Sequence, residues 1–118
     1  MIRLVKRSLK VSLLALAVLA TDAYSGELVR DAYVTEVANT NNNGADFAII
    51  LTGGTGVCTG SERVVITFPK SKFSGQSPGS YNQAFAIALT AFSTGAKVRA
   101  HNFEDNSCHG ANFISVSK

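Results

Sequence analysis

The sequence predicts a mainly β domain with one helix, in the order β-β-β-α-β-β. Short runs of β-branched and apolar residues alternate with turns rich in glycine and asparagine, whereas one stretch after residue 79 has the periodicity of a helix. A pair of cysteines, Cys58 and Cys108, indicates that a disulfide closes the domain.

The first 25 residues have the three regions of a secretory signal peptide. Basic residues come first: Arg3, Lys6, Arg7 and Lys10. The uncharged run 11–20 (VSLLALAVLA) follows, and it is too short to span a membrane as a helix, which takes about 20 residues. Ala23 and Ser25 place small side chains before Gly26, so we expect cleavage between Ser25 and Gly26. The mature chain is therefore expected to be periplasmic or secreted, with no stable membrane span.

Removal of residues 1–25 changes the charge of the protein. They hold four of the 11 Lys and Arg residues and one of the 8 Asp and Glu residues, so residues 26–118 carry seven of each. Nucleic-acid binding depends largely on clustered positive charge, and a neutral mature chain argues against it. Residues 26–118 are long enough for one small domain that benefits from a covalent staple.

The two cysteines are predicted to form a structural disulfide, Cys58–Cys108. In an oxidising compartment an isolated pair in a small exported domain is most simply bonded. The spacing is not CxxC, which also favours a structural bond over a reactive thiol.

Two strands are predicted to form a hairpin near the start of the domain. The segment 28–38 is rich in β-branched residues, and its second half, 33–37, has mixed faces. Asn43 and Gly44 tolerate the backbone angles of a tight turn, so the strand 46–52 (DFAIILT) should run antiparallel to the first. Its continuous apolar sequence predicts burial on both faces.

A third strand is predicted over 63–68 (RVVITF), ended by Pro69. The glycine-rich run 53–56 before it is expected to break the second strand in a turn. A loop follows over 70–79.

The helix is the strongest local prediction. Ser80 and Gln83 have the spacing of a capping box, and Gly95 stands where a helix-ending glycine belongs. One apolar face is predicted to pack on the core. Its members are Tyr81, Ala84, Phe85, Ala88, Leu89 and Phe92. Two further strands are predicted over 97–103, which alternates apolar and polar residues, and 111–117.

This element order is that of the OB-fold, a small and partly open Greek-key barrel. In such a barrel strands three and five lie side by side and parallel, which would bring Cys58 and Cys108 to the same end. The alternative fold is α+β, with one helix on an antiparallel sheet.

The segment 91–99 (AFSTGAKVR) resembles the helix-to-strand segment of the B subunits of AB5 toxins of the subtilase-cytotoxin and pertussis type. This resemblance implies an exported OB-fold protein with a disulfide that assembles into a ring and binds glycans. Thr35 is the nearest match to the serine with which those subunits hold sialic acid, and the chain contains no Trp. The chain also resembles small exported bacterial proteins of unknown function that share GELVRDA and TGGTG-x-C.

We therefore expect a small exported binding module rather than an enzyme, with a glycan or a protein as partner and a homo-oligomer as its assembly. The sequence predicts neither a cofactor nor a metal site nor a catalytic constellation. The predicted contact residues are polar or amphipathic side chains of strand one and the turn after it: Tyr33, Thr35, Asn41, Asn42 and Asn43. The asparagines alternatively only shape the turn. A periplasmic enzyme inhibitor, or a structural interaction protein, is the alternative function.

Overall fold

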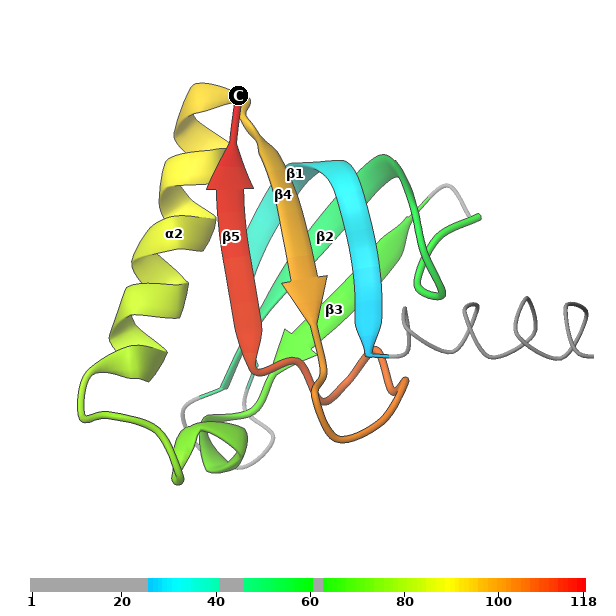
Figure 1. Ribbon diagram of the computed structural model, residues 1–118. Coiled ribbons are helices and arrows are strands. Elements are labelled where there is room, and N and C mark those ends of the chain that lie inside the picture. Colours follow the sequence, from blue (N-terminus) through cyan, green and yellow to red (C-terminus); the bar gives the residue numbers. More distant parts are fainter. Residues whose placement is uncertain (1–25, 41–45, 61–62) are drawn as a thin grey trace, which may run out of the picture.

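The computed structural model describes residues 26–40, 46–60 and 63–118 (Figure 1). The predicted order of strands and helix is confirmed. The elements are β1 (Glu27–Thr40), β2 (Asp46–Thr55), β3 (Val64–Phe68), the short 3-10 helix η2 (Lys70–Phe73), α2 (Ser80–Thr94), β4 (Lys97–His101) and β5 (Phe113–Ser117). No helix within these residues is long and apolar enough to cross a membrane.

The strands form one antiparallel sheet in the order β3-β2-β1-β4-β5. The predicted OB-like barrel is not confirmed, because β3 and β5 are the two edges of an open sheet. A short contact does join these regions: the Thr67 amide donates to the Cys108 carbonyl (3.0 Å), and the Ala111 amide donates to the Thr67 carbonyl (3.1 Å). The observed fold is a mainly antiparallel sheet with one helix packed on it, which was the alternative prediction.

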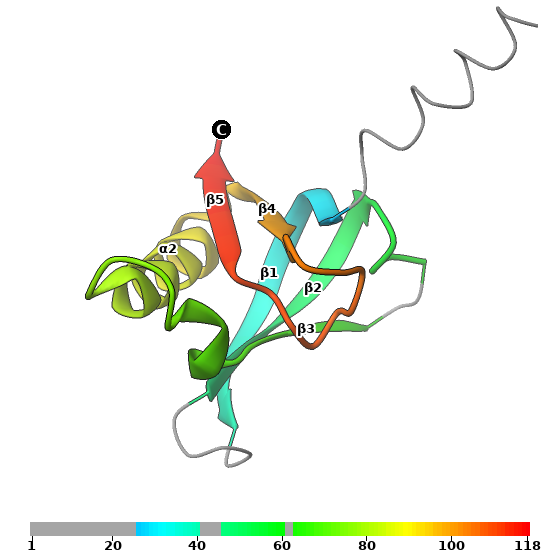
Figure 2. The ribbon, with the colours of Figure 1, turned by 60° about the horizontal axis from the view of Figure 1, so that its bottom comes forward.

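β1 is much longer than predicted and is strongly bent (Figure 2). It pairs with β2 from Arg30 to Thr40 and with β4 from Glu27 to Tyr33. The ladder with β4 shifts register between Val29 and Ala32, and Asp31 takes a left-handed conformation with φ 57° at that point. A bulge of this kind bends a strand and increases its twist.

The glycines of β2 lie opposite the bent part of β1. The predicted break at 53–56 is wrong for its first three residues, because β2 continues through Thr55. Gly54 has φ +80°, and a Cβ there would lie 2.6 Å from the carbonyl oxygen of Arg30. Only glycine combines this backbone angle with so close an approach. The glycine run therefore serves strand pairing and not only a turn.

The core lies between the sheet and α2, which contacts β1 and β5 (Figure 1). β2 is buried on both faces from Asp46 to Leu51, as its apolar sequence predicted. Phe47 stacks on Phe68 with ring centres 4.6 Å apart. The Tyr81 hydroxyl donates to the Phe68 carbonyl (3.0 Å) and ties α2 to the end of β3.

The predicted inner face of α2 is partly wrong. Three alanines face the sheet: Ala84, Ala88 and Ala91. The large side chains beside them are exposed, with Phe85 at 39%, Leu89 at 41% and Phe92 at 50% of their full accessible surface. The small alanine side chains let the helix approach the sheet closely. Phe85, Leu89 and Phe92 then lie beside the contact and remain exposed to solvent.

The prediction for the C-terminal end of α2 is confirmed, and the prediction for its N-terminal end is wrong. Gly95 ends the helix in a left-handed conformation with φ 71°, as predicted. The capping box is not formed, because Gly79 is the N-cap residue and Ser80 already lies in the first turn.

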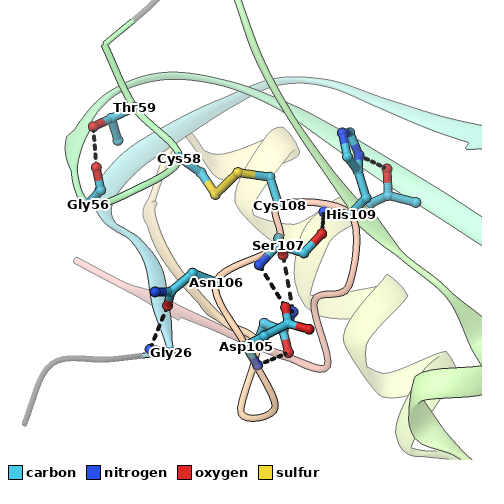
Figure 3. Close-up of a disulfide and its surroundings, with 11 residues drawn as sticks. Gly26, Gly56, Cys58, Thr59, Asp105, Asn106, Ser107, Cys108 and His109 are labelled. Carbon is cyan, nitrogen blue, oxygen red and sulfur yellow. Dashed lines mark hydrogen bonds between the residues drawn. A yellow bond between two sulfur atoms is a disulfide. The ribbon is translucent and has the colours of Figure 1, made fainter.

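The disulfide Cys58–Cys108 is present (Figure 3). It joins the β2–β3 and β4–β5 loops, which the strand registers bring to the same end of the sheet. Each cysteine is also tied to a strand. The Cys58 amide donates to the Leu28 carbonyl of β1 (2.9 Å), and the Cys108 carbonyl accepts from Thr67 of β3.

Replacing Gly54 by Ala should lower the free energy of unfolding by more than about 2 kcal/mol, because the new Cβ meets the Arg30 carbonyl and φ is positive. Gly75→Ala is the matched control, since a Cβ there meets nothing within 4 Å, and it should stay within about 0.5 kcal/mol of the parent. Urea unfolding measures both. Equal stability of the two variants would contradict the close packing of β2 on β1.

The double variant Cys58→Ala with Cys108→Ala should lose stability. A cross-link across 50 residues contributes up to about 4 kcal/mol by restricting the unfolded chain. Urea unfolding of the parent under reducing conditions should match that of the variant. If oxidised parent, reduced parent and variant all unfold at one urea concentration, the bond does not stabilise the domain.

Candidate functional site

The structure separates the contact residues predicted from the sequence. Tyr33 is 43% exposed and lines a hollow at the end of α2, beside Thr94, Lys97 and Val116. The Thr35 hydroxyl donates to the Ile50 carbonyl (3.2 Å), and Thr35 does not line that hollow. The turn asparagines, Asn41, Asn42 and Asn43, lie outside the described residues.

A different hollow, of about 220 Å³, lies where β1, β2 and α2 meet. We call it the junction hollow. It is lined by Asn39, Thr40, Asp46, Phe47, Tyr81, Asn82 and Phe85. The pairing of β1 with β2 places the first four together, since Thr40 is opposite Asp46 and Asn39 opposite Phe47. The first turns of α2 supply the other three.

Aromatic rings form one wall of the junction hollow. Phe47 is buried. It makes an edge-to-face contact with Phe85, and the two ring centres are 5.2 Å apart. The ring centres of Tyr81 and Phe47 are 5.4 Å apart. Because Phe47 also stacks on Phe68, the exposed ring of Phe85 is held by a rigid aromatic base.

Polar groups form the rest of the junction hollow. Asp46 is only 3% exposed, and its Oδ1 accepts a hydrogen bond from the Lys70 amide (3.0 Å). Asn39 and Asn82 present exposed side-chain amides. The Thr40 Oγ1 is buried and has no hydrogen-bond partner among residues 26–40, 46–60 and 63–118. The described residues therefore leave this hydroxyl unsatisfied.

Tyr81 is the group of the junction hollow whose pKa is displaced from its ordinary value. Burial, together with the negative charge of Asp46, raises the pKa of Tyr81 above its ordinary value of 10.0. The Tyr81 hydroxyl therefore stays protonated near neutral pH. In the described part of the chain, no three His, Cys, Asp or Glu side chains are grouped closely enough to hold a metal ion.

Sequence reasoning missed the helix side of this hollow. The sequence assigns Phe85 to the core face of the helix and gives no signal at Asn82, because nothing local connects either residue to the end of β1. The sequence did contain one indication of this site, a group of polar residues on either side of the β1–β2 turn. This group begins at Asn39.

Comparison with known proteins identifies a family but no activity. No curated protein and no solved structure matches the chain. A family model matches residues 8–118, nearly the whole chain. The protein therefore belongs to DUF5992, a family of unknown function.

Proposed function

We propose that this protein is an exported binding module that holds a glycan in the junction hollow. The observation that carries the proposal is the exposed ring of Phe85 beside the amides of Asn39 and Asn82, in a hollow that also includes Thr40, whose hydroxyl has no hydrogen-bond partner among the described residues. A sugar ring has an apolar face of C–H groups that suits an aromatic ring, and its hydroxyls pair with amides and hydroxyls.

Export is part of this proposal. It is supported by the signal-like residues 1–25 and by the disulfide, which persists in oxidising compartments. The neutral charge of residues 26–118 also suits an uncharged ligand better than a nucleic acid.

We further propose that the domain has an OB-like architecture. Closing the observed sheet between β3 and β5 would complete a five-stranded barrel, and the two hydrogen bonds of Thr67 lie along that seam. OB-folds bind oligosaccharides on one face and in the loops beside it. The resemblance of 91–99 to AB5 toxin B subunits points in the same direction.

The test is a glycan array probed with the disulfide-bonded protein, followed by affinity measurements on the glycans that it retains. Asn82→Ala should weaken binding at least about tenfold, because a hydrogen-bonding group is lost from the site without loss of core packing. Phe85→Ala should weaken it by a similar factor. Leu89→Ala is the control, since Leu89 is exposed on the same helix one turn away and does not line the hollow.

Two outcomes would overturn the proposal. Retention of no glycan at all would remove the glycan as ligand. Binding that survives Asn82→Ala and Phe85→Ala but is lost in Tyr33→Ala would move the site to the hollow at the end of α2.

A further inference from the structure

A second group of side chains lies on the outward face of β4 and β5 and shares no residue with the junction hollow. Arg99 and His101 point outward from β4, while Val98 and Ala100 are buried. The register of β5 places Phe113 opposite His101 and Ser115 opposite Arg99. We call Arg99, His101, Phe103 and Phe113 the outer cluster.

The aromatic part of the outer cluster presents an exposed ring. Phe103 is 66% exposed, the largest exposed fraction among the large apolar side chains of the described residues. It stacks on the His101 ring with centres 5.3 Å apart, and it lies 5.7 Å from Phe113. Aromatic pairs in such arrangements attract each other, so the ring of Phe103 has a supported position.

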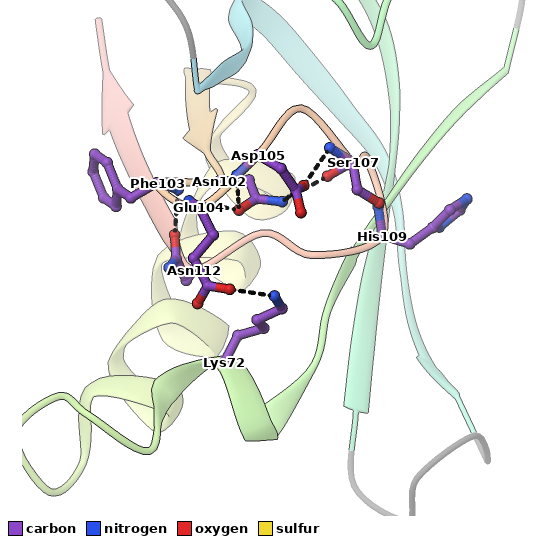
Figure 4. A network of polar contacts seen from close by, with 8 residues as sticks. All are labelled: Lys72, Asn102, Phe103, Glu104, Asp105, Ser107, His109 and Asn112. Carbon is purple, nitrogen blue, oxygen red and sulfur yellow. Dashed lines mark hydrogen bonds and ion pairs between the residues drawn. The ribbon is translucent and has the colours of Figure 1, made fainter.

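The loop that carries Phe103 is ordered by a polar network (Figure 4). The Phe103 amide donates to Asn112 Oδ1 (3.2 Å). Asn102 is completely buried, and its Oδ1 accepts from the amides of Glu104 (3.0 Å) and Asp105 (3.2 Å). An exposed ring on a loop fixed in this way is preorganised, which lowers the entropic cost of ligand binding.

The basic part of the outer cluster is Arg99. Its guanidinium lies over the Phe113 ring, 5.6 Å from the ring centre. Within the described part of the chain Arg99 makes no ion pair, and its buried Nε lacks a hydrogen-bond partner. An adjoining hollow of about 320 Å³ is lined by Arg30, Asp31, Val98, Arg99, Ser115 and Ser117.

The local charges favour a ligand with one negative charge. Arg30 is already paired with Glu27 at 2.8 Å. Lys97 lies on the same face of β4 as Arg99, and the adjoining hollow has one acidic side chain, Asp31, so these three groups leave one net positive charge. Burial, followed by the charge of Arg99, lowers the pKa of His101, so the imidazole is neutral near pH 7 and adds no charge. A doubly charged phosphate would exceed this single positive charge and would be repelled by Asp31.

We propose that the outer cluster binds a small aromatic carboxylate, with its carboxylate on Arg99 and Ser115 and its ring on Phe103. A guanidinium matches a carboxylate in geometry and charge, and the Ser115 hydroxyl supplies a second donor. The aromatic ring of the ligand covers apolar surface that the protein leaves in water. This site is independent of the proposed glycan site.

The experiment is a two-dimensional amide NMR titration of the disulfide-bonded protein with 3-phenylpropionate. The amides of Arg99, Phe103 and Ser115 should shift and saturate. The neutral 3-phenylpropionamide and the ringless propionate should each bind at least tenfold more weakly, because each lacks one of the two groups that the site engages.

Variants separate the two contacts. Arg99→Gln and Phe103→Ala should each weaken 3-phenylpropionate binding at least tenfold, whereas Arg63→Gln, at an exposed arginine paired with Glu36, should not. Asn82→Ala should leave 3-phenylpropionate binding unchanged. A failure of the proposed glycan site would therefore not affect the proposed carboxylate site. The assignment is overturned if no saturable shift occurs, if the amide binds as well as the acid, or if inorganic phosphate binds more tightly than 3-phenylpropionate.

Discussion

The bend of β1 is the constraint on which the rest of the structure depends. A single strand of 14 residues serves both halves of the sheet, since β2 pairs along it and β4 pairs with its first half. The bend requires a left-handed residue at Asp31 and, across the ladder, Gly54 without a Cβ against the Arg30 carbonyl. The junction hollow takes residues from β1, and the hollow beside the outer cluster is lined by Arg30 and Asp31 of the same strand, so the angle between its halves determines where each site lies. The junction hollow uses the end of the strand, and the outer cluster adjoins its start.

The loops at one end of the sheet hold this bent arrangement together. The disulfide joins them covalently, and the cysteines are hydrogen-bonded to β1 and β3. The start of β1 is tied to the same loops, because the Gly26 amide donates to Asn106 Oδ1 (3.1 Å) (Figure 3). The Gly26 carbonyl also accepts from the Asn102 amide (2.8 Å). A domain of this size buries a limited core, so such cross-links supply a substantial part of its stability.

The sequence was informative where a structure depends on neighbouring residues and, for the disulfide, because two cysteines allow one intramolecular pairing. The order of the elements, the burial of β2, the end of the helix at Gly95 and the disulfide were all predictable. The inner face of α2 was not, because apolar residues cover a wide arc of the helix and periodicity does not say which edge of that arc faces inward. The close approach allowed by the alanines turns Phe85 outward. Neither site could be predicted from the sequence, for a related reason. Which end of β1 lies near α2, and which end lies near β4, depends on the order of the strands in the sheet.

Hydrogen–deuterium exchange of the backbone amides of β1, in the disulfide-bonded protein, tests the central role of the bent strand most directly. If the strand joins both halves of the sheet into one cooperative unit, hydrogen-bonded amides between Val29 and Val37 should exchange only through complete unfolding, with equal opening free energies on both sides of the bend. The account would be contradicted if amides in the half paired with β4 exchanged through a separate, less costly opening while the half paired only with β2 stayed protected.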